Sequence, residues 1–173
     1  MKRTRKGFTL LELLVVIGVM GILSSTAMIA GQQATDGARA TTIAEGLEKA
    51  ASAMMMYYAD NAEVIAVEGV AAEATVTEAK LVTGTNAYLK TTDAIVAKAN
   101  AAAGKYSVSI EGEAPAQTWW IVYTLPATDI AGVGPILANK ANRMGLMTAA
   151  GGTTAYAGAT ATIAMKVRGT ASE

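Results

Sequence analysis

The sequence predicts an α+β fold in which one long N-terminal α-helix packs on a small antiparallel β-sheet. Helical character extends from about residue 8 to residue 60, and alternation of apolar and polar residues recurs between residues 105 and 167. The chain has 173 residues, which suffices for one domain of ordinary size plus attached segments. We therefore divide it into residues 1–7, 8–35, 36–60, 61–104 and 105–173.

The distribution of charged residues along the chain says more about its function than the net charge does. The 14 basic and 14 acidic residues balance, so no strong field favours a nucleic acid or an acidic substrate. Four basic residues lie within the first six, and a chain without residues 1–7 has a net charge of −4. The chain has no Cys and no His, which removes thiolate chemistry and the commonest general base. We expect no enzymatic activity, no catalytic or metal-binding residues and no cofactor.

An uncharged stretch of 23 residues runs from Leu13 to Thr35. As a helix it would measure about 35 Å, long enough to cross a bilayer core, with the preceding basic residues on the cytoplasmic side. A plain membrane anchor and a secretory signal cleaved after Ser25-Thr26-Ala27 are both compatible with it. The apolar run exceeds the usual signal length, however, and Glu12 places a carboxylate near its start, where a signal needs nothing acidic.

Residues 7–17 read Gly-Phe-Thr-Leu-Leu-Glu-Leu-Leu-Val-Val-Ile. This run closely resembles the prepilin cleavage motif of the type IV pilin and type II secretion pseudopilin superfamily. The resemblance implies a type IV pilin-like fold, removal of residues 1–7 by a prepilin peptidase that cuts between Gly7 and Phe8, and methylation of the new amine on Phe8. It also implies an inner-membrane assembly platform and an ATPase as partners, and a homo-oligomeric helical filament as product.

The resemblance gives Glu12 a role in assembly. Cleavage after Gly7 creates an ammonium group on Phe8, and two opposite charges in an apolar filament core attract strongly while each alone is costly there. In the family, the carboxylate is thought to meet the terminal amine of a neighbouring subunit, and we assign that role to Glu12 and Phe8. The alternative is that Glu12 only reaches the membrane interface.

The helix continues beyond the membrane stretch as an amphipathic segment. Ile43, Leu47, Ala50, Met54 and Tyr58 form one apolar stripe. Gly18 and Gly21 weaken the first half, and we consider local melting near Gly21 and close helix packing through small residues as equal alternatives. Many relatives have a proline shortly after this point, whereas this chain has Met28-Ile29-Ala30.

Three strands and two short helices are expected in the remainder. Strands are predicted at residues 105–111 and 118–125, joined as a hairpin through residues 112–117 with Pro115, and again at residues 160–167. By the resemblance, residues 61–104 take the place of the variable connection between helix and sheet in pilins. A short helix is expected within them at residues 92–102. A second short helix is expected at residues 134–144, beginning at Pro135.

Adjacent Trp119 and Trp120 should point to opposite faces of a strand. We expect one ring to pack in the core and the other to be a surface or subunit contact. The low-complexity residues 149–162 are expected to form a loop, with a subunit contact or a glycosylated surface as alternatives.

The leading functional hypothesis is a major pilin, membrane-held by a single pass as a precursor and extracellular after assembly. The alternative is a major pseudopilin of type II secretion. Such subunits commonly carry a calcium site near the C-terminal loops, and after Glu113 this chain has only Asp129 and Glu173 as acidic residues. A secreted binding module released after Ala27 and an enzyme are the less favoured classes.

Overall fold

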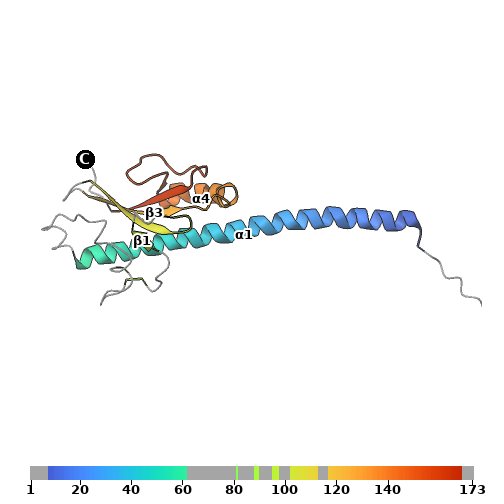
Figure 1. Cartoon of the computed structure of the whole chain (residues 1–173), viewed down its shortest axis with the longest axis horizontal. Helices are drawn as coiled ribbons and strands as arrows, with labels where there is room; N and C mark the ends of the chain where they lie inside the picture. The colour runs from blue at the N-terminus through green and yellow to red at the C-terminus, as the bar shows by residue number, and fades with distance from the viewer. Residues whose placement is uncertain are drawn as a thin grey trace, which may run out of the picture. The chain divides into compact units, whose positions relative to one another are not determined.

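The computed structural model describes residues 8–61, 81, 88–89, 95–97, 102–112 and 117–168. The chain divides into two units, Met1–Thr35 and Asp36–Glu173. Helix α1, Leu10–Asp60, contributes its first half to the first unit and its second half to the second (Figure 1). The predicted single helix from residue 8 to residue 60 is therefore confirmed to within two residues.

The second unit contains a five-stranded sheet in the order β1-β2-β3-β5-β4. The strands are β1 (Ile95–Ala97), β2 (Tyr106–Glu111), β3 (Thr118–Thr124), β4 (Leu146–Met147) and β5 (Thr162–Arg168). Strand β3 pairs antiparallel with β2 and β5, and β5 pairs antiparallel with β4. Strand β1 pairs parallel with β2. The α+β class and the three predicted strands are confirmed.

The core lies between one face of the sheet and the second half of α1. The predicted stripe is buried at Ile43, Leu47, Ala50 and Met54, and Tyr58 lies at its edge. Trp119, Ile121 and Tyr123 alternate along β3 and point to the same face of the sheet. The ring of Trp119 meets Tyr58 edge to face with centroids 5.4 Å apart.

One of the two expected short helices is wrong, and the other is confirmed but begins earlier than expected. Residues 95–97, expected inside a helix at residues 92–102, form β1, because a parallel register with Tyr106–Val108 satisfies their backbone groups; residues 92–94 and 98–101 lie outside the described part. Helix α4 spans Ile130–Met144, so Pro135 lies inside it. Its first turn forms before the proline, since the Val133 N–H donates to the Asp129 carbonyl at 2.8 Å.

The expected exposure of one tryptophan is also wrong, because both rings are buried. Trp119 is 2% exposed and Trp120, on the opposite sheet face, is 4% exposed. The loop after β4 reaches that face, since a Cβ on Gly151 would lie 3.5 Å from Cγ of Glu111, which belongs to β2. Glu111 and Trp120 share this face, since Ser109 pairs with Trp120. Trp120 is therefore buried on the sheet face that this loop approaches.

The loop predicted at residues 149–162 is confirmed as irregular backbone up to β5, and it is anchored at two points. Tyr156 is buried, its N–H donates to the Leu146 carbonyl at 2.9 Å, and its hydroxyl donates to the Thr160 carbonyl at 3.0 Å. Gly158 has a φ of 87° and packs directly on the backbone of Gly134 in α4. A side chain at Gly158 would be strained by the positive φ and would also collide with the backbone of Gly134.

The contact between α1 and β2 requires a glycine in the middle of a helix. A Cβ on Gly46 would collide with the hydroxyl and ring of Tyr106, whose hydroxyl donates to the Ile43 carbonyl at 3.3 Å. Burial, aided by neighbouring Tyr123, raises the pKa of Tyr106 to about 12. The cost of glycine in a helix is thus offset by a close approach of the sheet.

Replacing Gly46 with alanine should lower the free energy of unfolding by about 1–3 kcal/mol, the usual cost of overpacking. Gly37→Ala is the matched control, because a Cβ there meets nothing within 4 Å. That control should be neutral or gain up to about 1 kcal/mol from helix propensity. Urea unfolding of the full chain in detergent, followed by fluorescence of its two tryptophans, measures both. Equal stability of the two variants would show that Tyr106 does not need the glycine.

Candidate functional site: the N-terminal helix

The described part of the motif begins at Phe8, whose side chain is 79% exposed. Thr9 precedes α1 and caps it, since its Oγ1 accepts a hydrogen bond from the N–H of Glu12 at 3.3 Å. The sequence Thr9-Leu10-Leu11-Glu12 has the spacing of a capping box, in which Ser or Thr before a helix is followed three residues later by Glu or Gln. Glu12 thus lies in the first helical turn, where the helix dipole favours a negative charge.

This capping arrangement was missed in the sequence analysis, although the Thr-x-x-Glu spacing is a readable signal. It places the Glu12 carboxylate one turn from Phe8 at the start of a rigid helix. Gly7 and the rest of residues 1–7 lie outside the described residues, so the predicted cleavage position stays a prediction. The roles of Phe8 in methylation and of Glu12 in charge pairing likewise stay predictions.

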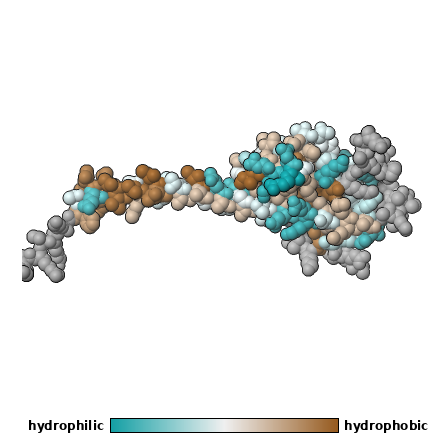
Figure 2. Space-filling model, turned by 180° about the vertical axis from the view of Figure 1, so that it is seen from behind, coloured by the Kyte–Doolittle hydropathy of each residue, from teal (hydrophilic) through white to brown (hydrophobic). Residues whose placement is uncertain are grey.

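Large hydrophobic side chains, before and after Glu12, surround the chain from Phe8 through the first half of α1. The large hydrophobic side chains of this stretch are between 46% and 84% exposed. They are Phe8, Leu10, Leu11, Leu13, Leu14, Val15, Val16, Ile17, Val19, Met20, Ile22, Leu23, Met28 and Ile29. Figure 2 shows hydrophobic residues following one another along this segment. Such a surface far exceeds the exposed apolar patches of soluble monomers and calls for lipid or other helices as neighbours.

Polar side chains within this apolar stretch satisfy their hydrogen bonds locally. The hydroxyl of Ser25 donates to the Ile22 carbonyl at 2.8 Å, and that of Thr26 donates to the Leu23 carbonyl at 2.9 Å. Hydroxyls bonded to their own helix can enter an apolar medium at little cost. Among the described residues, α1 is long enough and apolar enough to cross a membrane.

Helix α1 is continuous through Gly18 and Gly21. A Cβ at either position would meet nothing within 4 Å in the single chain. Melting near Gly21 and close packing against another helix both concern the assembled state. Both therefore stay predictions.

The rest of the described structure holds no group of three or more His, Cys, Asp or Glu side chains suited to a metal ion. Trp119 and Trp120, the other predicted contact residues, occupy adjacent positions of β3, and both are buried. The candidate functional surface of the described chain is therefore the exposed apolar stretch before Asp36 in α1, in which Glu12 is the single carboxylate.

A comparison with protein families agrees with this location. The prokaryotic N-terminal methylation motif matches residues 2–28. No curated protein and no solved structure matches the chain. The motif is the signature of prepilin-type precursors of type IV pilins and pseudopilins, and this chain carries it.

The fold is consistent with this motif. A long N-terminal helix, apolar in its first half and packed by its second half on a small, mainly antiparallel sheet, fits an α+β pilin-like fold. The motif implies processing by a prepilin peptidase and points to a structural protein rather than an enzyme. With the apolar helix, it fits a precursor anchored in the membrane.

Proposed function

We propose that the chain is the major subunit of a type IV pilus-like filament. Cleavage after Gly7 frees the amine of Phe8, which is methylated, and the helix then leaves the membrane for a filament core. An inner-membrane platform and an ATPase drive this step, and the filament lies outside the cell. The observation that carries the proposal is the apolar surface of α1, interrupted at its start by one carboxylate.

Physical chemistry explains why that carboxylate would direct assembly. A carboxylate in hydrocarbon costs about 2.5–3.5 kcal/mol on insertion scales, so it needs a cation nearby. The amine on Phe8 supplies one after cleavage, and a staggered neighbour can bring its own amine to Glu12. Pairing between neighbouring subunits then fixes the axial register, while the apolar side chains bury one another.

Electron microscopy of material sheared from cells that express the chain with its export machinery tests this proposal. We expect long filaments that contain the chain as their main component. A pseudopilin of type II secretion would instead give only short filaments, so filament length separates the two members of the class. Recovery of the chain solely as a soluble monomer would contradict both.

A further inference from the structure

The burial of α1 begins abruptly at Asp36. Every residue in the range 8–35 is exposed, Asp36 is the first that is partly buried, and Ala40, one turn later, is 0% exposed. The second unit of the chain also begins at Asp36. The sequence itself weakens the helix at this boundary, because Gly31 and Gly37 each cost up to about 1 kcal/mol relative to alanine. Tertiary contacts at this point therefore decide whether the helix stays closed.

Asp36 makes the first of these contacts, with the N-terminal turn of α4. Its carboxylate packs against Gly132, the third residue of α4, since a Cβ at Gly132 would collide with Oδ2 of Asp36 and lie 2.7 Å from its Cγ. The first turn of α4 contains no acidic residue, and the free N–H groups of a helix N-terminus carry a partial positive charge. Asp36 of α1 thus supplies the negative charge that the helix dipole of α4 favours.

Arg39 makes a second contact, one turn further along α1. Its guanidinium donates to Oδ1 of Asp129 at 2.9 Å, and the side chain of Asp129 is only 14% exposed. Asp129 is the N-cap residue of α4, but its side chain makes no capping hydrogen bond. Its Oδ1 instead accepts from Arg39 and, at 3.1 Å, from the hydroxyl of Thr128. Helix α1 therefore provides the charge at the N-terminus of α4, and the N-cap residue of α4 binds α1.

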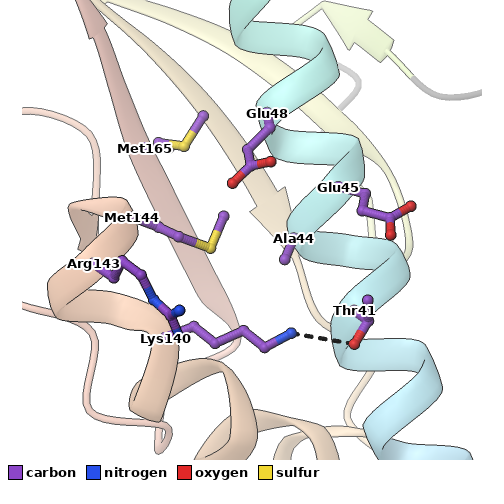
Figure 3. Close-up of a pocket in the computed structure, with 8 residues that line it drawn as sticks. All are labelled: Thr41, Ala44, Glu45, Glu48, Lys140, Arg143, Met144 and Met165. Atoms are coloured by element: carbon purple, nitrogen blue, oxygen red, sulfur yellow. Dashed lines mark hydrogen bonds between the residues drawn. The ribbon is translucent and has the colours of Figure 1, made fainter.

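A hydrogen bond between Lys140 and Thr41 is the third contact. The Lys140 ammonium of α4 donates to Thr41 Oγ1 of α1 at 3.2 Å (Figure 3). From there the two helices line a groove of about 410 Å³, whose other residues include Glu48 and Arg143. Among the described residues that line this groove, no ion pair crosses it. In the described chain, the polar links between α1 and α4 are therefore gathered in residues 36–41.

We propose that Asp36, Arg39 and Thr41 clamp α1 to α4 and stop local opening of α1 at Asp36. An opening that starts in the exposed half breaks only helical hydrogen bonds until it reaches Asp36. There it must also separate a carboxylate from the N-terminus of α4 and break the Arg39–Asp129 ion pair. The apolar half can then change conformation among lipid or helix neighbours while the second unit stays folded. This inference goes beyond the proposed function, because it concerns the single chain.

Hydrogen exchange of the full chain in detergent, read by mass spectrometry, tests the clamp. In the variant Asp36→Asn/Arg39→Gln, the amides of residues 37–43 should exchange about tenfold faster than in the wild type, the size expected for one helix-dipole contact and one partly exposed ion pair. The amides of residues 47–57 should keep their rates. Glu45→Gln is the matched control, because it removes an exposed charge of α1 that pairs with Lys49 and not with α4. That control should change no rate by more than about twofold.

Gly132→Ala gives an independent readout, because it leaves every charge in place and displaces only the carboxylate of Asp36. It should accelerate exchange in residues 37–43 about threefold, whereas Arg39→Lys, which keeps a cation for Asp129, should stay within about twofold of the wild type. Equal acceleration in residues 37–43 and 47–57 would show a general loss of stability and contradict a local clamp. Unchanged rates in both the double variant and Gly132→Ala would also overturn it. None of these outcomes requires filaments, so the clamp and the proposed function fail separately.

Discussion

Replacing Glu12 with glutamine should abolish filament assembly while the leader is still removed. Glutamine keeps the side-chain length and the capping-box spacing with Thr9 but cannot neutralise the amine of Phe8. Removing one partner of a buried ion pair costs about 3–5 kcal/mol because the other charge stays unpaired. Since each 1.4 kcal/mol is tenfold, subunit association should weaken at least about 100-fold.

The measurement is the amount of the chain in the sheared fraction, compared with the amount of cleaved chain in the membrane. Thr9→Ala is the matched control, because it removes the hydroxyl that caps α1 and keeps the carboxylate. That variant should lose about 1 kcal/mol of helix stability and still assemble. Equal loss of filaments in the two variants would assign Glu12 a capping role instead of charge pairing. Wild-type yield from Glu12→Gln would remove the charge-pairing account altogether.

Replacing Gly7 with leucine should leave the uncut precursor in the membrane and prevent assembly. The motif implies a peptidase that needs a small residue before the cut, so a bulky side chain blocks access. The uncut chain also keeps its first amine far from Glu12, which leaves the carboxylate without its cation. Immunoblots of membrane and sheared fractions should show one band, larger than the mature subunit by seven residues.

Gly7→Ala is the control for this experiment, because alanine stays small and should be cleaved and assembled. Normal cleavage of Gly7→Leu would contradict the assigned cut. Cleavage combined with absent filaments would place the defect after processing. The two outcomes therefore separate recognition by the peptidase from polymerisation.

Local sequence patterns predicted the parts of the fold that depend on short-range periodicity. The 3.6-residue stripe through Leu47 located the buried face of α1, alternation around Val108 located β2, and the density of β-forming residues around Ile121 located β3. Strand β1 was missed because its parallel pairing depends on residues eleven positions later, which no local pattern reports. Strand β4 has only two residues, too few to show alternation.

The apolar surface of α1 could be predicted from composition alone, because its signal is contiguous. The roles of Phe8 and Glu12, which belong to one short motif, stay predictions. The burial of Trp120 could not be predicted, since packing on that sheet face brings together segments distant in sequence, such as Gly151 and Glu111. The groove between α1 and α4 likewise joins residues about 95 positions apart, such as Glu48 and Arg143.

Intact-mass analysis of the subunit from sheared material tests the central claim most directly. The account predicts a chain that begins at Phe8, carries one added methyl group on its terminal amine and retains Glu12. A soluble, unassembled chain that begins at Met28, 20 residues further on, would contradict it.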